Sequence, residues 1–452
     1  MFTNTDTVLF IDDAAIADTI RLSRVWEKPR KFGPVVTPEH PWEGHCVIVF
    51  GSVLERPGGG GYQMWYQSFQ RQYQKAPLGF FCYAESDDGV NWVKPSLGIV
   101  EVDGSTDNNV VINIPDRKQE SLSVIIEEDA PESERYKMLL YRGGGPNGEV
   151  HGLYAAYSLD GIHWTEREEA VLPGTGDRTA CFVAPEREAR YVGLGRQPGM
   201  MEEFRARTVS RTESNDFVNW SPMETMLVPD LDDSWDLQFY GMTAFKYRDM
   251  YLGQLELLWS TPDICNIELV HSRDTIHWNR TREVFLEAGP EEWDSYWVGP
   301  TSSGPIERDG QLYFYYEGRN RSHEKILPFP KASIGLAVLP KDRFCALEAG
   351  SVEGIVTTES FTCDGDVTMN VNAHSGGITD HYAYGGYVRA EVLDAEGQPI
   401  PGFTYDESER GHGNNAAWEP TWTGGASLES LKGQTISLRI YLVNARLYAI
   451  SS

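Results

Sequence analysis

SDDGVNW at residues 86–92 is the first of four copies of a turn motif that decides the fold of this chain. The other copies are SLDGIHW at 158–164, SNDFVNW at 214–220 and SRDTIHW at 272–278. Each contains an Asp that can bond backbone amides in a tight turn, and a Trp that we expect to pack back over the turn. The copies start 72, 56 and 58 residues apart. Such a period accommodates one four-stranded antiparallel sheet per repeat.

Three strand-like runs rich in aromatic and β-branched residues precede each motif, and this is the pattern of a propeller blade. In the first repeat they are HCVIVFGSVL from His45, YQMWYQS from Tyr62 and GFFCYAES from Gly79. A fifth set keeps the three runs but has PKDRF in place of the turn motif. The sequence therefore predicts a five-bladed β-propeller, with an N-terminal extension, over residues 1–350.

From Val352 onward the pattern changes to alternating strands with Gly-rich turns, and the Trp motif does not recur. This pattern is typical of a β-sandwich. We therefore expect an accessory β-sandwich domain at residues 351–452. The complete prediction is an all-β chain in which a five-bladed β-propeller is followed by a C-terminal β-sandwich.

Charge and hydropathy exclude several classes of partner. The 452 residues include 39 basic and 67 acidic side chains, a net charge of −28 that argues against a nucleic-acid ligand. No run approaches the roughly 20 apolar residues that cross a bilayer, so no membrane partner is expected.

The first fifteen residues lack the pattern of a secretory signal, which predicts a cytoplasmic protein unless a signal was removed before the numbering begins. The sequence leaves the oligomeric state open.

The cysteines and histidines do not form a metal-binding pattern. No Cys-x-x-Cys, His-x-His or His-Glu-x-x-His spacing occurs, and several cysteines lie in apolar runs. We interpret all six as reduced core residues; they are Cys46, Cys82, Cys181, Cys265, Cys345 and Cys363. No cofactor is predicted, and a structural calcium ion on the propeller axis is left open.

Carboxylates near the start of each blade's first strand are the candidates for catalysis, because the innermost strands of a propeller converge on a central channel. Glycoside cleavage needs two carboxyl groups. Asp177 is the first choice for one role, since the neighbouring Arg178 could keep it ionised. Three acids that directly follow a Trp compete for the other role: Glu43, Asp236 and Asp294. The second blade offers Asp116 and Glu120.

Aromatic and charged residues near these acids are the candidates for substrate binding, because an aromatic ring stacks on the apolar face of a sugar. They are Trp42, Arg178, Trp235, Glu256, Trp293, Trp297, Glu317, Arg319 and His323. The alternative for each acid is that it caps a turn or pairs with a surface arginine. The alternative for the charged segment after Glu317 is a solvated loop.

On these residues the chain resembles the bacterial five-bladed propeller glycoside hydrolases of the furanosidase superfamily (families 32, 43, 68 and 117), and is most similar to family-32-like proteins. The resemblance is carried by FIDD from Phe10, the WE and MWY segments of the first blade, ERYKM from Glu134, the turn motifs, and LRIYLVNARLYAI from Leu438. It implies a nucleophile or base from the first blade, a supporting Asp from the second and an acid from the third. This chain has Glu43 instead of an Asn-Asp-Pro segment, Pro-Asp-Arg at 115–117 instead of Arg-Asp-Pro, and Asp177 instead of a Glu-Cys pair.

The leading functional prediction is an exo-acting glycoside hydrolase that cleaves an oligo- or polysaccharide with two carboxylates at the propeller axis. A sialidase-like hydrolase is the second interpretation, because the turn motif resembles the Asp-box and several arginines could hold a substrate carboxylate, namely Arg142, Arg178, Arg196 and Arg319. The third is a noncatalytic carbohydrate-binding propeller. Two carboxyl groups about 5 to 9.5 Å apart would favour an enzyme.

Overall fold

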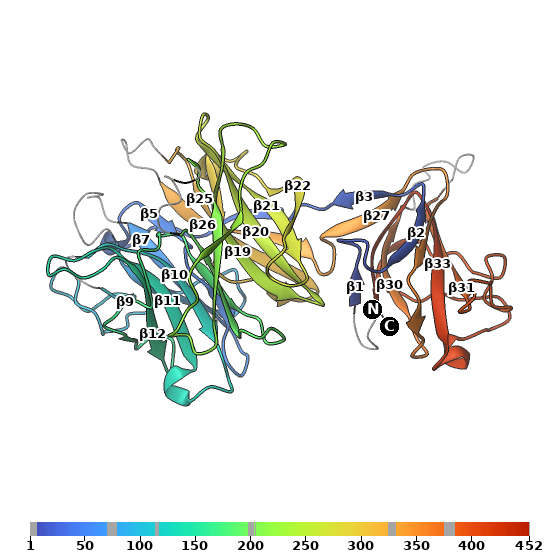
Figure 1. Cartoon of the computed structure of the whole chain (residues 1–452), viewed down its shortest axis with the longest axis horizontal. Coiled ribbons are helices and arrows are strands. Elements are labelled where there is room, and N and C mark those ends of the chain that lie inside the picture. The colour runs from blue at the N-terminus through green and yellow to red at the C-terminus, as the bar shows by residue number, and fades with distance from the viewer. Residues whose placement is uncertain are drawn as a thin grey trace. The chain divides into compact units, whose positions relative to one another are not determined.

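The computed structural model describes residues 7–69, 79–113, 117–197, 203, 205–323, 331–374 and 385–451. The chain divides into two compact units, which Figure 1 shows with their strands labelled. One unit is Pro29–Leu339, and the other combines Met1–Lys28 with Pro340–Ser452. Strands dominate both units and are joined by short 3₁₀ turns, so the predicted all-β fold is confirmed.

Strand pairing in the larger unit gives sheets of five, four and fourteen strands, and in the largest sheet the parallel bridges β21–β23 and β26–β5 join three antiparallel groups. For reference we number the antiparallel groups blades 1 to 5. Blade 1 contains β5 (Cys46–Ile48), β7 (Tyr62–Phe69), β8 (Phe81–Ser86) and β9 (Val110–Ile112). Blade 2 contains β10 (Gln119–Ile126), β11 (Tyr136–Arg142), β12 (Gly152–Ser158) and β13 (Thr165–Glu166). Blade 3 contains β15 (Ala180–Val183), β16 (Tyr191–Gly195), β17 (Val209–Ser214) and β18 (Glu224–Leu227). Blade 4 contains β19 (Leu237–Tyr247), β20 (Met250–Trp259), β21 (Ile264–Ser272) and β22 (Asn279–Leu286).

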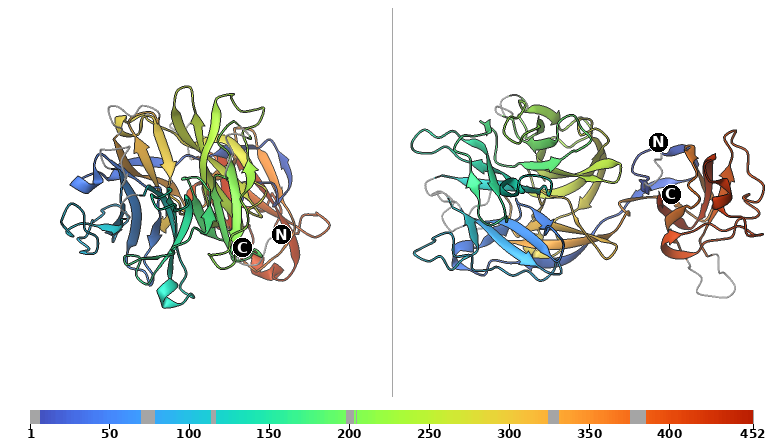
Figure 2. Two further views of the ribbon diagram at one scale, coloured as in Figure 1. Left: turned by 60° about the vertical axis from the view of Figure 1, so that its left-hand side comes forward. Right: turned by 90° about the horizontal axis from the view of Figure 1, so that it is seen from below.

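Blade 5 draws its strands from two distant parts of the sequence. It contains β23 (Trp297–Pro300), β25 (Gln311–Arg319) and β26 (Ala332–Pro340), and its fourth strand is the N-terminal β4 (Arg30–Val36), which pairs with β26. The N-terminal strand thus completes the blade that lacks the turn motif. In the right-hand view of Figure 2 the blades follow one another around the unit in the order of the colour bar.

The first strands of neighbouring blades are linked directly by hydrogen bonds. The Leu122 amide of β10 donates to the Phe50 carbonyl after β5 at 2.7 Å, and the Ser302 amide after β23 donates to the Gly51 carbonyl at 2.6 Å. Ser121 Oγ of β10 exchanges hydrogen bonds with the backbone of Thr179 before β15. These links join the first strands of blades 1, 2, 3 and 5 around a common centre.

The four turn motifs adopt the same structure. In the first motif Asp88 Oδ1 accepts hydrogen bonds from the Val90 and Asn91 amides at 2.8 and 2.7 Å, and Ser86 Oγ accepts from the Gly89 amide at 2.9 Å. The other three motifs repeat these contacts. These bonds to the carboxylate lower the pKa of each motif Asp. The motif carboxylates are therefore engaged in holding the turns.

The smaller unit is a two-layered β-structure. One sheet runs β3 (Ser23–Trp26), β27 (Cys345–Ala349), β34 (Ala445–Ser451), β30 (Thr368–Ala373) and β32 (Gly413–Trp418), with β1 (Thr7–Leu9) paired to β34. The other contains β2 (Ile16–Ile20), β28 (Gly354–Thr358), β33 (Thr435–Val443), β29 (Phe361–Thr362) and β31 (Tyr387–Leu393). One apolar cluster, which includes Phe10, Val371, Leu438 and Leu447, fills the space between strands of both sheets.

Two predicted boundaries differ from this structure. The N-terminal extension was assigned to the propeller, but β1, β2 and β3 pair with strands of the smaller unit. The division also falls at Pro340 and not at residue 351, because β27 belongs to the smaller unit. The sequence did not predict these boundaries because the strands pair with partners far away in the chain, and such pairing leaves little local pattern in the sequence.

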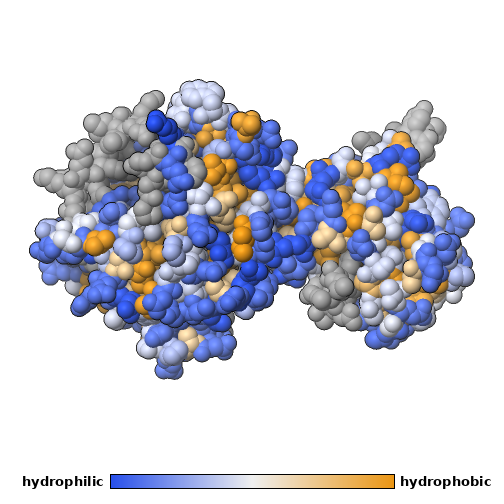
Figure 3. Space-filling model, viewed as in Figure 1, coloured by the Kyte–Doolittle hydropathy of each residue, from blue (hydrophilic) through white to orange (hydrophobic). Residues whose placement is uncertain are grey.

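The face shown in Figure 3 is mostly hydrophilic with scattered apolar residues, as the high charge of the chain implies. All six cysteines are free and buried, as predicted. In the part of the chain that the structure describes, no helix is long and apolar enough to span a membrane.

Candidate active site

Four charged side chains meet where the first strands of blades 2 and 3 begin. Lys118 Nζ contacts Glu120 Oε2 at 2.5 Å and Asp177 Oδ2 at 2.9 Å. Arg196 Nη1 donates to the other oxygen of Asp177 at 3.0 Å. Lys118, Glu120 and Asp177 are 36, 15 and 28% exposed, so the cluster remains open to solvent. We call these four residues the open cluster.

Bulges in two first strands adjust the backbone at this centre. Ser121 has φ of +53°, and the register of β10 shifts between Glu120 and Leu122. The register of β19 also shifts between Phe239 and Gly241, around Tyr240. A bulge inserts one residue and changes the direction of the side chains beside it. The bulge at Ser121 thereby sets the direction of Glu120.

The two carboxyl groups of the open cluster have opposite acidities. Burial and the neighbouring Asp177 charge raise the pKa of Glu120 to about 7, although Lys118 opposes them. Burial alone would raise the pKa of Asp177, but Arg196 and Lys118 lower it to about 2. Near neutral pH, Glu120 can therefore hold a proton while Asp177 is ionised. Such a difference between two neighbouring acids is typical of an acid–base pair in an active site.

A second set of charges adjoins the open cluster and is buried. Arg178 Nε donates to Glu256 Oε2 at 2.6 Å, and Arg319 Nη2 donates to Glu317 Oε1 at 2.6 Å. Glu256 and Glu317 are fully buried. The guanidinium groups of both arginines lie over the Phe50 ring, at 4.2 Å for Arg178 and 5.6 Å for Arg319. We call Arg178, Glu256, Glu317 and Arg319 the buried cluster.

Two glycines make room for these buried carboxylates. A Cβ at Gly241 would lie 2.5 Å from Glu256 Oε2, and a Cβ at Gly299 would lie 3.0 Å from oxygens of both Glu256 and Glu317. Burial, with a contribution from Glu256, raises the pKa of Glu317. Glu256 Oε1 and Glu317 Oε2 make no hydrogen bond within the described residues. The buried cluster supplies charge beside the open cluster, but its carboxylates are not exposed to a ligand.

Aromatic rings form another wall of the centre. Tyr240 packs edge-on against Trp297 with ring centres 4.6 Å apart, and Tyr240 Oη lies 3.3 Å from His323 Nε2. Arg196 stacks on the Tyr240 ring at 4.4 Å. Trp297 is fully buried, so its ring cannot stack on a sugar as predicted. Two aromatic rings contact the open cluster directly: Tyr240 through Arg196, and Tyr141, over whose ring Lys118 Nζ lies at 5.6 Å.

Glu43 and Asp294, two predicted catalytic acids, lie elsewhere in closed ion pairs. Glu43 is fully buried in η1 (Pro41–Glu43), where Lys94 Nζ lies 2.8 Å from Oε1 and Tyr66 Oη donates to Oε1 at 2.7 Å. Asp294 is fully buried in η3 (Glu292–Asp294). Lys31 Nζ contacts its Oδ2 at 2.7 Å, and Tyr316 Oη contacts the same atom at 3.2 Å.

The tryptophans that precede these acids are engaged with the protein. Trp42 stacks on His40 at 4.5 Å and donates its Nε1 hydrogen to Asn109 Oδ1 at 2.8 Å. Trp293 packs against Gly318 and the Tyr316 ring. The pairing of Trp and acid in these two segments therefore anchors a 3₁₀ turn, which corrects the prediction that they form a sugar site.

The third predicted pair lies at the surface. Asp236 Oδ2 accepts from the Thr261 amide at 3.2 Å, and the bond helps to lower the pKa of Asp236 although desolvation opposes it. Trp235 is 90% exposed and immediately precedes β19, the strand that carries Tyr240. Asp236 is not brought to the open cluster. The Trp235 ring is therefore accessible to a ligand.

The sequence prediction thus located some of the site and missed other parts. Of the acids chosen for catalysis, Asp177 alone lies in the open cluster. Arg196 and Lys118 stabilise its ionised form, whereas the prediction had named Arg178 for this role. Arg178, Glu256, Glu317 and Arg319, which were predicted to bind substrate, lie together in the buried cluster. Glu120 was named only as an alternative, and Asp116 lies outside the described residues. The sequence signal for Glu120 was the charged segment RKQE directly before an apolar strand.

Within the described ranges, no group of three or more His, Cys, Asp or Glu side chains is arranged to hold a metal ion. The arginines named for a sialidase-like site are also engaged by protein groups. Arg142 forms two hydrogen bonds with Glu166, at 3.0 and 2.5 Å, and the other three pair with carboxylates of the two clusters. A substrate carboxylate would have to displace these partners.

Comparisons with known proteins were made by family, sequence and structure. No family model matches the chain, and no curated protein matches its sequence. Solved structures similar to it include a glycoside hydrolase, which has 15% identity over 70% of this chain and 94% of that chain, with a TM-score of 0.49. A fructofuranosidase variant from Schwanniomyces occidentalis complexed with fructosylnystose has 9% identity over 95% of this chain and 99% of that chain, and a TM-score of 0.47.

A third similar structure is an N-acetylgalactosamine deacetylase from F. plautii in complex with blood group B trisaccharide. It has 14% identity over 72% of this chain and 97% of that chain, with a TM-score of 0.47. At identities this low the activity has to be argued from the residues of the site itself.

Proposed function

We propose that this chain is a glycoside hydrolase in which Glu120 protonates the oxygen of the leaving group and Asp177 is the second carboxylate. The observation that carries the proposal is the shared contact with Lys118, together with pKa values of about 7 and about 2. Glycoside cleavage needs one protonated and one ionised carboxyl group on either side of the scissile bond. The open cluster supplies such a pair at neutral pH.

The spacing of the pair supports a retaining mechanism. The sum of the two distances to Lys118 Nζ, 5.4 Å, is the upper limit for the separation of Glu120 Oε2 from Asp177 Oδ2. Retaining enzymes hold their carboxyl groups about 5 to 5.5 Å apart, whereas inverting enzymes need about 6.5 to 9.5 Å for a water molecule. Lys118 is the most exposed member of the cluster, so it is the side chain that a substrate would displace.

The noncatalytic carbohydrate-binding propeller is the second candidate. It is favoured by the ion pairs of Asp177, both of whose oxygens already face cations. The two candidates differ in one measurable respect, because binding alone does not require the proton on Glu120.

The test is a screen of the full chain against aryl glycosides and oligosaccharides, including furanosides, fructosides and anhydro-galactose sugars. We expect release of one sugar. NMR should show that this product first appears with the same anomeric configuration that it had in the substrate. Release of the opposite anomer would contradict the assignment of Asp177 as nucleophile. Measurable binding of a panel member without turnover, unchanged in Glu120→Gln, would favour the noncatalytic candidate.

A further inference from the structure

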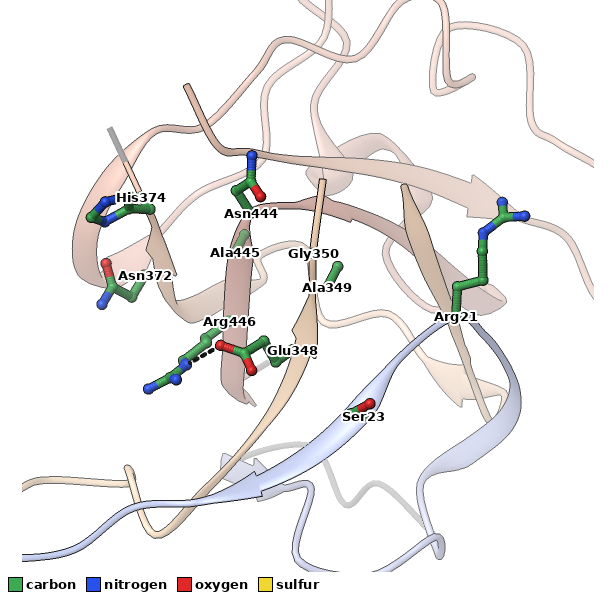
Figure 4. Close-up of a pocket in the computed structure, with 10 residues that line it drawn as sticks. All are labelled: Arg21, Ser23, Glu348, Ala349, Gly350, Asn372, His374, Asn444, Ala445 and Arg446. Carbon is green, nitrogen blue, oxygen red and sulfur yellow. Dashed lines mark hydrogen bonds and ion pairs between the residues drawn. The ribbon is translucent and has the colours of Figure 1, made fainter. Parts of the chain in front are cut away.

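The smaller unit contains a polar hollow of about 530 Å³, shown in Figure 4. Its polar lining includes Ser23, Glu348, Asn372, Asn444 and Arg446. Every one of these residues belongs to the smaller unit. Its volume is within the roughly 300 to 1,000 Å³ typical of small-ligand pockets. We propose that this hollow binds a neutral saccharide through hydrogen bonds to its hydroxyl groups.

Strand register explains why the floor of the hollow is polar. Glu348 of β27 lies opposite both Ser23 of β3 and Arg446 of β34, and Asn372 of β30 lies opposite Arg446. Residues directly opposite in antiparallel strands point to the same face of the sheet. The four side chains therefore form a continuous polar row across four strands, while Ala349 and Ala445 are buried on the apolar side.

The central pair of this row is fixed by hydrogen bonds. Arg446 Nε donates to Glu348 Oε1 at 2.8 Å, and Arg446 Nη1 donates to Glu27 Oε1 at 2.7 Å. Glu348 and Arg446 are 38 and 33% exposed, so both remain accessible from the hollow. A ligand would meet acceptors and donors that are already in position, which reduces the entropy lost on binding.

Unused hydrogen-bonding groups flank the fixed pair. In the described part of the chain, the side-chain amides of Asn372 and Asn444 form no hydrogen bond with protein groups. Each amide offers two donor hydrogens and one acceptor oxygen. A sugar hydroxyl both donates and accepts, so amides beside a carboxylate and a guanidinium are suited to neighbouring hydroxyls of one sugar ring.

The charges of the lining favour a neutral ligand over an anion. Glu348 and Glu27 neutralise Arg446, and in Figure 4 the Arg21 side chain extends away from Asn372 and Arg446. No unpaired cation of the row is thus directed at the centre of the hollow. The polar lining also excludes a mainly apolar ligand, because its burial would leave these groups without hydrogen bonds.

Affinity electrophoresis of the full chain tests the proposal with native gels that contain a neutral or an acidic polysaccharide. The variant is Asn372→Ala combined with Asn444→Gly; glycine is chosen because Asn444 has φ of +42°. The matched control is Gln398→Ala, which removes an exposed amide of the same unit outside the hollow. Melting temperatures of all three proteins establish that they are folded.

We expect at least one neutral polysaccharide to retard the wild type and the control, and the double variant to bind it at least about fivefold more weakly. This expectation rests on about 0.5–1.5 kcal/mol for each hydrogen-bonding group removed. Equal retardation of the double variant would place binding elsewhere and overturn the proposal. Retardation by acidic polysaccharides alone, or by none, would also overturn it. The double variant keeps Glu120 and Asp177, so its hydrolytic activity reports separately on the proposed function.

Discussion

The larger unit contains two kinds of contact between acidic and basic side chains, which differ in their exposure to solvent. Glu43 and Asp294 are each fully buried between a lysine and a tyrosine. Glu120 and Asp177 share one partly exposed lysine, and an arginine reinforces only Asp177. In the closed pairs a fully buried acid faces a lysine, and Lys94 has a second, exposed partner in Glu39 at 3.3 Å. In the open cluster both acids share Lys118, but only Asp177 has a second cation in Arg196, so the pKa values of the two acids move apart. Exposure to solvent and the opposite pKa shifts of two neighbouring acids therefore distinguish the candidate catalytic contact from the structural ones.

The largest expected effect tests the open side of this comparison. Glu120→Gln removes the proton donor and is expected to lower kcat by about 10²–10⁴-fold, with little change in melting temperature. The loss should be much smaller on dinitrophenyl glycosides, because that leaving group departs without protonation. An equal loss on both substrates would mean that Glu120 does not act as the acid.

Removing a closed pair should affect stability and not catalysis. Glu43→Gln removes the buried counter-charge of Lys94 and leaves it only the exposed Glu39 at 3.3 Å, so we expect a loss of up to about 3–5 kcal/mol in unfolding free energy by urea denaturation. The rate per folded molecule should be unchanged. Asp236→Asn is the matched control at a partly exposed site and should hardly change stability. A large loss of activity in folded Glu43→Gln would show that the closed pairs have a catalytic role.

The pH dependence tests the cause of the acidity difference. The protonated form of Glu120 is the active acid, so kcat/KM should fall as pH rises through about 7. Lys118→Gln removes a cation that stabilises the carboxylate, which should raise the pKa of Glu120 and move this limb to higher pH. Asp177→Asn removes a negative charge and should lower the pKa, as measured by ¹³C NMR of the carboxyl group. Shifts in the same direction for both variants would contradict this electrostatic account.

The smallest expected effect concerns the exposed ring of Trp235. Trp235→Ala should raise KM for oligosaccharides by about two- to tenfold, since stacking on an aromatic ring is worth about 0.5–1.5 kcal/mol. Aryl monosaccharides should be cleaved as before, because they are too short to reach this ring. Equal effects on both substrates would remove Trp235 from the substrate-binding residues.

Local sequence patterns predicted the strands and turns well. The turn motif needs only seven consecutive residues to form its hydrogen bonds, so its four copies indicated the repeating sheets. The active-site acids were harder to predict because side-chain direction depends on the bulge at Ser121 and on partners from other blades. An acid next to a Trp was interpreted as a sugar site, but for Glu43 and Asp294 it marks a 3₁₀ turn. Arg178 follows Asp177 directly, yet it pairs with Glu256 of another blade.

The strand pairing of the termini has a consequence for the order in which the chain folds during synthesis. Thr7 pairs with Ser451, and β1, β2 and β3 all wait for partners from the last quarter of the sequence. The larger unit is complete once Leu339 has emerged from the ribosome, whereas the smaller unit cannot close until β34 is made. A nascent chain therefore carries three unpaired N-terminal strands while its central unit is already folded.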